Sequence, residues 1–227
     1  MAFPATFRSI KDSVIAKLRL DSDADDDRVG DWVNQVYADL CVDTEAVQTA
    51  STMALTADSA TYTLPSAVVR IKWMFVTPVG GTASIALEPV TMEQILRWRM
   101  SGGSTASTGS VQYYALNGND LIDFYPTPAA ADTITMYYVK LPQGLANDDD
   151  TPEISEPYAS KILEYGALSE GADFKRDPSE QQYRALYASW MQRFRQHLRR
   201  REGGVAKQFD VYQSGSVAPH DPSMDVR

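Results

Sequence analysis

The chain has 227 residues, of which 44% are hydrophobic, and its formal net charge is −9 at pH 7. A chain of this length buries about 70% of its unfolded surface, so we expect one or two globular domains that need no disulfide or metal to fold. The single cysteine, Cys41, excludes a disulfide framework and every multi-cysteine zinc or iron–sulfur site. No signal-peptide pattern opens the chain, and no run approaches 18 apolar residues. We therefore expect neither export nor a membrane span.

The charge is divided unevenly along the chain. Residues 1–150 contain 10 Lys and Arg against 19 Asp and Glu, whereas residues 151–227 contain 11 of each sign. Within the neutral part, residues 183–207 hold seven basic residues against Glu202 alone. Such asymmetry suits head-to-tail self-association or a composite docking surface, because unlike faces attract and orient one another. A solvated helix face is the alternative explanation.

Two amphipathic helices are predicted at the start of the chain. Ile10, Val14 and Leu18 recur at helical spacing, which predicts a first helix over residues 7–19. An acidic run, residues 21–27, places carboxylates where the dipole of a second helix favours them. The second helix follows from the apolar positions Val29, Trp32, Val33, Val36, Tyr37 and Leu40.

From about Thr49 the hydrophobic spacing changes to two, which predicts strands. The expected strands cover residues 61–64, 69–75, 85–87, 111–116, 121–125 and 133–139. Asn117-Gly118 favours the positive φ angles of a tight hairpin turn. One brief helix is predicted over residues 91–100, followed by a Gly/Ser/Thr-rich loop over 101–110.

Two further helices are predicted near the end of the chain. The third follows Pro157 and runs to about Asp173. The fourth begins at Asp177-Pro178-Ser179-Glu180, which supplies a cap, a first-turn proline and an acid three residues after the cap. Its apolar face consists of Tyr183, Leu186, Tyr187, Trp190, Met191, Phe194 and Leu198. We expect Gly203-Gly204 to end this helix.

This order of elements predicts an α+β fold in which an antiparallel β module is inserted into a helical bundle. Residues 1–45 and 151–202 form the bundle in this interpretation, and residues 46–150 form the β module. Residues 203–227 are expected to form a flexible C-terminal tail.

No motif in the sequence favours catalysis, a cofactor or a metal. The stretch Asp21-Ser-Asp-Ala-Asp begins like a calcium loop, but Asp26 replaces the required glycine and Trp32 replaces the bidentate glutamate. The two histidines form no dyad with a nucleophile, and no phosphate-binding glycine loop is present. We therefore assign no catalytic, cofactor or metal residue and expect a protein that is not an enzyme.

The aromatic stripe of the fourth helix, together with its arginines, raises the possibility of single-stranded nucleic acid binding. A continuous stripe at helical spacing is more often core, and the arginines lie mainly off it. Sequence-specific DNA binding would also work against the net charge of −9. An acidic surface suits a passage through which DNA moves without sticking.

The sequence resembles the head-to-tail adaptor (connector) proteins of tailed bacteriophages, including the tail-tubular type, over most of residues 7–202. Three stretches carry the resemblance: YYALNGNDLIDFYPTP from Tyr113, ITMYYVKLP from Ile134, and the acidic turn Asp148 to Pro152 before the Tyr158 helix. A hairpin ending in Pro-x-Pro, a tyrosine-bearing strand, an Asp-rich link and an Ala-rich helix recur in this order in such proteins.

The resemblance implies a structural virion protein, made in the host cytoplasm, that forms a homo-oligomeric ring, typically twelve-fold, below the portal in the neck. Such a ring continues the DNA channel, without sequence-specific DNA binding, and attaches a downstream tail or neck protein. We expect the interface with the portal or a neighbouring subunit to involve Arg195, Arg199, Arg200, Arg201, Phe209, Val211 and Tyr212. A tail-terminator, tail-tube or neck-completion protein is an alternative of the same class.

A carbohydrate- or cell-surface-binding β module is an alternative of another class. It requires exposed aromatic side chains on the sheet, for which the candidates are Trp73, Tyr113 and Tyr125.

Overall fold

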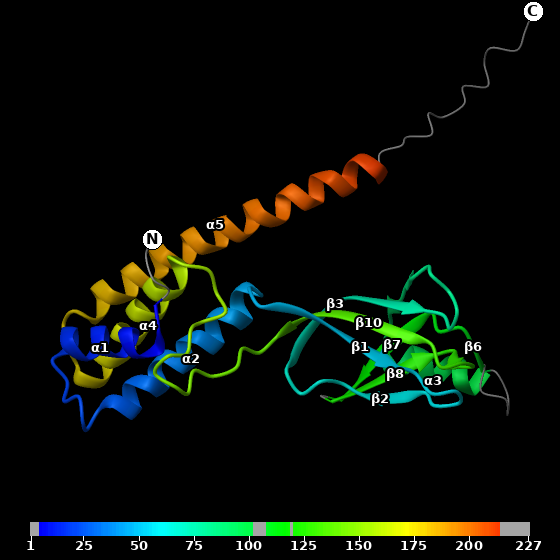
Figure 1. The fold of residues 1–227 in the computed structure, drawn as a ribbon, viewed down its shortest axis with the longest axis horizontal. Helices are drawn as coiled ribbons and strands as arrows, with labels where there is room; N and C mark the ends of the chain where they lie inside the picture. Colours follow the sequence, from blue (N-terminus) through cyan, green and yellow to red (C-terminus); the bar gives the residue numbers. More distant parts are fainter. Residues whose placement is uncertain (1–4, 102–107, 119, 214–227) are drawn as a thin grey trace, which may run out of the picture.

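The computed structural model describes residues 5–101, 108–118 and 120–213, with side chains described as far as Arg201. Four helices gather at one end of the molecule, and the strands gather at the other with one short helix (Figure 1). This arrangement confirms the predicted α+β class. The helical unit comprises α1 (Phe7–Leu18), α2 (Asp26–Thr44), α4 (Tyr158–Lys175) and α5 (Glu180–Gln213). The β unit comprises β1 to β10 and α3 (Met92–Ser101).

Helix α4 is the centre of the helical unit, because α1, α2 and α5 all pack against it. Small side chains allow this close approach. A Cβ added at Gly166 would lie 2.4 Å from Val36 of α2, and one added at Gly171 would lie 2.4 Å from Leu18 of α1. Real Cβ atoms do not approach other atoms so closely, so both positions require glycine at the present helix spacing.

Helix α5 extends further than the sequence analysis predicts. It passes through Gly203-Gly204 and ends at Gln213, so the expected stop at these glycines is wrong. Glycine inside a helix costs about 1 kcal/mol relative to alanine, which weakens the helix without ending it. The spacing of Val205, Phe209 and Tyr212 also continues the helical period of the sequence beyond the glycines.

The β unit is built from two four-stranded sheets that share one core. The first sheet has the order β1 (Gln48–Ala54), β10 (Thr133–Lys140), β3 (Val68–Thr77) and β4 (Ile85–Ala86). The second has the order β2 (Thr61–Thr63), β8 (Leu121–Tyr125), β7 (Tyr113–Asn117) and β5 (Glu88–Pro89). Met74, Val76, Ile134, Ile122 and Phe124 lie between them and are buried.

Strand pairing in the β unit is antiparallel with two exceptions. The predicted β7–β8 hairpin is confirmed, and Gly118 has the positive φ of 74° that the turn requires. β5 pairs in parallel with β7, and β6 (Thr108–Gly109) pairs in parallel with β9 (Thr127–Pro128). All the longer strands pair antiparallel, so the predicted antiparallel module is confirmed. The two short parallel pairs were not predicted, because the two-residue strands β5, β6 and β9 carry too little periodicity. Residues 102–107 of the expected loop lie outside the described residues.

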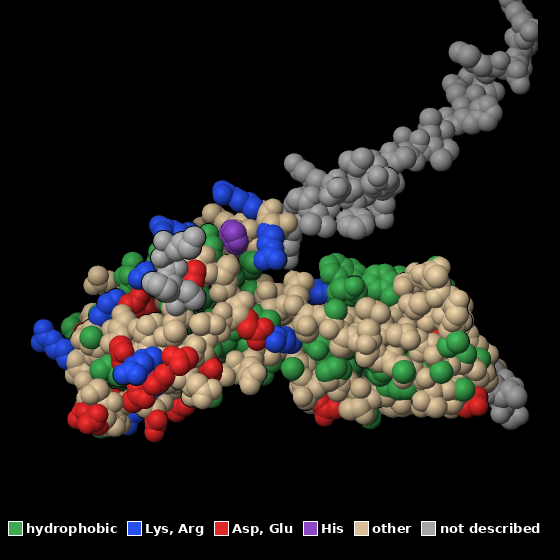
Figure 2. Space-filling view, viewed as in Figure 1, with side chains coloured by type: hydrophobic (Ala, Val, Ile, Leu, Met, Phe, Trp, Pro, Cys, Tyr) green, Lys and Arg blue, Asp and Glu red, His purple; other side chains and the backbone are tan. Residues whose placement is uncertain are grey.

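The outer faces of the two sheets differ. Helix α3 covers the second sheet: Trp98 packs on Tyr113 and Tyr125, with ring centroids 5.0 and 5.2 Å apart. The outer face of the first sheet has no such helix, and it leaves Trp73 59% exposed. The top of the β unit in Figure 2 therefore carries a hydrophobic surface.

The chain passes twice between the two units, and side chains fix both passages. After β10, the returning segment is held to α2 by Asn34, whose amide accepts a hydrogen bond from Leu145 N–H (2.8 Å) and donates one to Leu145 O (3.0 Å). The Tyr37 hydroxyl accepts a hydrogen bond from Glu153 N–H at 2.7 Å. On the outgoing passage, Glu45 bonds Arg70 at 2.6 Å and also bonds Lys72.

The first prediction concerns the contact at the centre of the helical unit. Gly166→Ala forces a Cβ into Val36, so we expect a loss of about 1–3 kcal/mol in the free energy of unfolding despite the better helix propensity of alanine. Urea denaturation measures this loss. Gly144→Ala is the matched control, because its Cβ would meet its nearest neighbour, Asn34, at an ordinary 3.7 Å. Equal stability of Gly166→Ala and wild type would contradict the argument.

Candidate interaction surfaces

The second half of α5 is rich in exposed arginines, and we define its basic face as Arg193, Arg195, Arg199, Arg200 and Arg201. All five side chains are exposed. The apolar stripe of α5 packs on the helical unit through the buried residues Met191 and Phe194. The arginines therefore point away from the core and are available to a partner.

The aromatic stripe of α5 is core, as the sequence analysis predicts. The ring of Tyr158, in α4, lies 5.2 Å from Phe194 and 5.0 Å from His197 between centroids. Trp190 packs on Tyr158 in an edge-on contact at 6.4 Å. Because these rings are occupied by one another, they offer no platform on which nucleic acid bases could stack.

Two arginines of the basic face have partners among the described side chains. Arg195 lies 3.7 Å from Asp43, and Arg193 stacks over Trp190 at 4.9 Å. Among the described side chains, Arg199, Arg200 and Arg201 have no acidic partner. These three arginines follow one another in a single turn of the helix, where they create a local positive potential on the exposed surface of α5.

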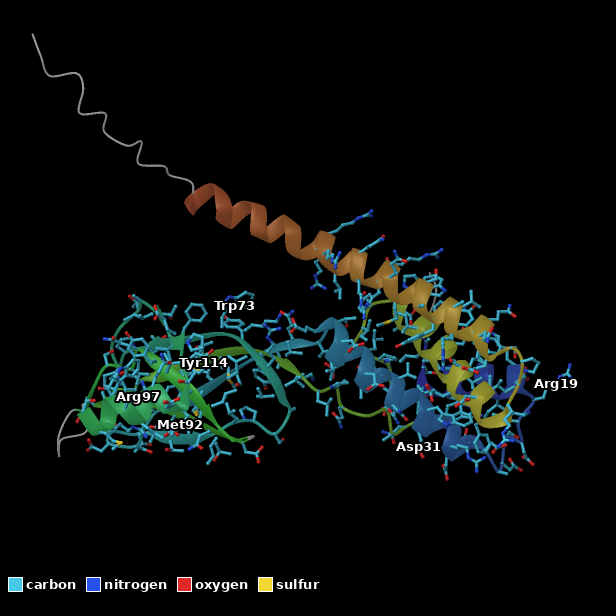
Figure 3. The ribbon with its side chains drawn as sticks, turned by 180° about the vertical axis from the view of Figure 1, so that it is seen from behind. Arg19, Asp31, Trp73, Met92, Arg97 and Tyr114 are labelled. Atoms are coloured by element: carbon cyan, nitrogen blue, oxygen red, sulfur yellow. The ribbon has the colours of Figure 1, made fainter. Side chains whose placement is uncertain are left out.

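The second charged surface is an acidic end, which we define as Asp21, Asp23, Asp26, Asp27 and Asp31. It lies at the α1–α2 turn and the start of α2, at the opposite end of the helical unit from the β unit (Figures 2 and 3). In Figure 2 red side chains gather along this lower edge, whereas blue ones follow α5 along the upper edge. The two signs are therefore separated in space as well as in sequence.

Several aspartates of the acidic end and their neighbour Asp25 are engaged in local contacts. The Asp21 carboxylate accepts a hydrogen bond from Asp23 N–H at 2.9 Å, and Asp25 binds Arg28 at 2.6 Å. Asp26 binds Lys11 at 2.6 Å. No group of three Asp, Glu, His or Cys side chains within the described residues is arranged to hold a metal ion.

Lys11 connects the acidic end to the returning segment. Its ammonium binds Asp26 and lies 3.2 Å from Asp148. Burial alone opposes its charge, but the hydrogen bonds to Asp26 and Asp148 outweigh burial and raise the pKa of Lys11. Backbone N–H groups of Phe7 and Arg8 also donate to Asp150 O (2.8 Å) and Asp148 O (3.1 Å). The turn at residues 148–150 therefore anchors the start of α1.

A buried carboxylate, Glu164, lies inside the helical unit. Burial raises its pKa, but hydrogen bonds from Lys17, Ser13 and Lys161 outweigh burial, so the pKa of Glu164 is lower than usual. The Lys161 ammonium lies 3.0 Å away. Because Ser13 and Lys17 of α1 and Lys161 of α4 all donate to it, this carboxylate links α1 to α4. Its environment is that of a structural ion pair rather than that of a general acid.

The β unit has a groove of about 660 Å³ between the two sheets, lined by β3, the β4–β5 segment and β7. Trp73, Met92 and Tyr114 are among its lining residues, and Figure 3 shows them in one part of the β unit. Of the three aromatic candidates for a carbohydrate platform, Tyr113 and Tyr125 are stacked on Trp98, and Trp73 is on the other sheet. The three rings therefore do not share one exposed surface.

The structure brings together four of the seven expected interface residues, the arginines at positions 195 and 199–201. Phe209, Val211 and Tyr212 are in the C-terminal part of α5, and their side chains lie outside the described part of the chain. The sequence analysis did not detect the exposed edge of the β unit, which is described below. No helix within the described residues has the length and apolar character needed to cross a membrane.

The helical unit thus carries two separated charged surfaces, and the β unit is inserted between its second and third helices, α2 and α4. The chain belongs to the SU10 adaptor protein family, whose model matches residues 5–219. This is a phage head–tail adaptor family, so the protein is a bacteriophage structural adaptor and a virion component, as the resemblance predicts. No curated protein matches the sequence.

The second prediction concerns Glu164. Because its pKa is lowered on folding, its contribution to stability is present above the usual value of 4.5 and is lost as the pH falls through the lower folded-state value. Glu164→Gln leaves Lys17 and Lys161 without a counter-charge, so we expect a loss of about 1–2 kcal/mol at pH 7.

Urea denaturation from pH 7 to pH 3 tests this expectation. The difference in the free energy of unfolding between the variant and the wild type should shrink as the pH falls toward 3. Glu93→Gln is the control, since it breaks an exposed pair with Arg97 and should change stability by at most about 0.5 kcal/mol. A deficit that is constant over the whole pH range would count against the role of the Glu164 charge.

Proposed function

We propose that this adaptor assembles as a ring below the portal, twelve-fold by analogy with similar proteins. In this proposal the ring continues the DNA channel and offers the attachment surface for a downstream tail or neck protein, and genome ejection passes through it. The observation that carries the proposal is the separation of the acidic end from the basic face of α5.

A ring of identical subunits needs two unlike, complementary flanks on each subunit. The acidic end holds five aspartates, and the basic face holds three arginines without an acidic partner among the described side chains. Contact between the acidic end of one subunit and the basic face of the next would neutralise both. It would also favour one orientation over all others, since like charges repel.

Net charge supports the proposed passage of DNA. Each subunit carries −9, so a closed ring multiplies the negative charge around its lumen. Double-stranded DNA is itself densely negative, so repulsion would keep it from adhering to the wall. Because the basic arginines would be engaged in protein contacts, they would not offset this repulsion.

We assign separate roles to the parts of the chain. The bundle segments, residues 1–45 and 151–202, would build the wall of the ring, and residues 46–150 would face outward or toward the tail. Residues 203–227 would order on the portal or on a neighbouring subunit, with Phe209, Val211 and Tyr212 as apolar contacts. The first part of this last segment continues α5 as far as Gln213.

The third prediction addresses assembly directly. Native mass spectrometry of the purified protein, alone and mixed with the portal protein of the same virion, should show a closed ring in at least one sample. A ring that forms only with the portal would indicate templated assembly. A subunit that stays monomeric in both samples, with no portal complex, would overturn the proposal.

The fourth prediction concerns the basic face. Replacing Arg199, Arg200 and Arg201 with alanine removes three charges that have no acidic partner among the described side chains, so we expect ring formation or portal docking to weaken at least tenfold. The reason is that charge contacts enclosed in the proposed interface would each be worth about 1 kcal/mol or more. The apparent dissociation constant, obtained from native mass spectrometry across a concentration series, measures the effect.

The matched control replaces three exposed arginines that already have acidic partners, Arg8, Arg97 and Arg184, with alanine. This variant changes the net charge by the same amount and should assemble almost normally. Equal behaviour of the two triple variants would show that only net charge matters and would remove the basic face from the interface.

A further inference from the structure

Strand β1 is the outermost strand of its sheet, and no other described strand pairs with its outer edge. Lys140 N–H donates to Val47 O at 3.1 Å, and Leu55 N–H donates to Asp132 O at 2.8 Å, so odd-numbered residues of this stretch direct their backbone groups toward β10. Backbone direction alternates along an antiparallel strand. The N–H and C=O groups of the even-numbered residues therefore point away from the sheet, and these residues are Gln48, Ala50, Thr52 and Ala54.

The other edges of the two sheets are protected. β4 and β5 have two residues each, and β5 ends in Pro89. β2 has three residues. The part of β3 that β4 leaves uncovered carries Arg70 and Lys72, which are both held by Glu45. Short strands, proline and charge are the features by which proteins prevent unwanted strand pairing.

β1 has none of these protections. Its seven residues, QTASTMA, contain no charge and no proline, and its pairing with β10 runs without a bulge. The exposed side chains of the outward-directed residues are small or neutral, so they would not obstruct an added strand. A long, neutral, unprotected edge is a template for strand addition.

From this edge we infer that β1 is a docking strand for the segment that follows α5 in a second copy of the chain, centred on residues 214–218. The inference rests on the proposed self-assembly. Residues 214–218, SGSVA, are uncharged like β1, and Pro219 limits a paired strand to about the length of the free edge. Residues 214–218 span about 17 Å when extended, which is most of the length of the seven-residue edge of β1.

Pairing of β1 with β1 of a second copy is the competing arrangement. Such an interface is two-fold and closes after two subunits, whereas a donated segment gives every subunit one donor and one acceptor. The separated charges of the helical unit favour this head-to-tail arrangement, because the acidic end and the basic face are unlike surfaces. The donated segment and the charged flanks would then both join each subunit to the next one in the same head-to-tail order around a ring.

Interchain cross-linking of the full-length protein tests the inference. One copy, labelled with ¹⁵N, carries Thr52→Cys on β1, and the other carries Val217→Cys. The native Cys41 is fully buried and should not compete. With a short bismaleimide, we expect the yield of the mixed cross-link to be at least tenfold higher than the yield of a control pair. In the control pair, Thr63→Cys on the β2 edge replaces Thr52→Cys.

A second pair of variants tests the backbone hydrogen bonds. Ala50→Pro removes an outward-directed N–H, which edge strands tolerate, and should reduce the mixed cross-link at least fivefold. Ala50→Val keeps the N–H and should leave the yield unchanged. Circular dichroism and urea denaturation establish that both variants fold before the yields are compared.

Two results would overturn the inference: equal yields at Thr52 and Thr63, or cross-linking mainly between two Thr52→Cys copies. Subunit number is measured on the same samples by native mass spectrometry. Intact rings without a preference for the mixed Thr52→Cys and Val217→Cys cross-link would reject strand docking but leave the proposed function standing. The absence of any assembly would count against the proposed function.

Discussion

The close approach of α4 to its neighbours is the constraint on which the helical unit depends. A Cβ at Gly166 or Gly171 would overlap Val36 or Leu18 by more than real packing allows, so the spacing of the helices is set by the absence of two side chains. This contact determines where α5 lies, because α5 packs on α4. Gly166 also faces α5, because an added Cβ would lie 3.2 Å from Tyr187. The direction of the basic face, and therefore the geometry of any contact through it, depends on this close approach.

The position of the β unit depends on polar contacts at the two passages. Asn34 satisfies both backbone groups of Leu145, and Tyr37, which is so deeply buried that its pKa is raised to about 12, holds Glu153. Such pairs are worth more inside a protein than at its surface, and they leave no buried side-chain donor or acceptor unsatisfied among the described residues. Together with the contacts of Glu45, the hydrogen bonds of Asn34 and Tyr37 fix the two segments that connect the helical unit to the β unit.

Periodicity predicts most elements of this fold, and the reason is visible in the core. Ile10, Val14 and Leu18 of α1 are buried, as their spacing indicates. Just before α5, the Asp177 carboxylate accepts a hydrogen bond from Ser179 N–H at 2.9 Å, as expected for a residue at a helix start. The β7–β8 hairpin follows from Asn117-Gly118. The two-residue strands β5, β6 and β9 were not predicted, because they are set by tertiary neighbours, whereas β4 lies within the predicted strand 85–87. The end of α5 was misjudged because glycine weakens a helix without ending it.

The interaction surfaces were predictable only where charge marks them. Sequence identifies the arginines of α5 and the aspartates near residue 25, since both form runs, and the structure separates them on the surface. A neutral edge strand has no run of charged residues by which it could be recognised in the sequence. QTASTMA becomes recognisable only when the topology places β1 at the end of its sheet and the hydrogen bonds of Val47 and Leu55 fix which residues face outward.

The two kinds of surface are complementary in physical terms. Charge acts over about 8–10 Å at physiological ionic strength and orients an approaching subunit, but solvent-exposed pairs stabilise the final contact weakly. Strand addition acts only at contact distance, where it replaces hydrogen bonds to water with a continuous ladder. An adaptor that must assemble in one direction and then remain assembled needs both actions, and the distribution of charge, glycine and neutral edge in this chain is consistent with that division.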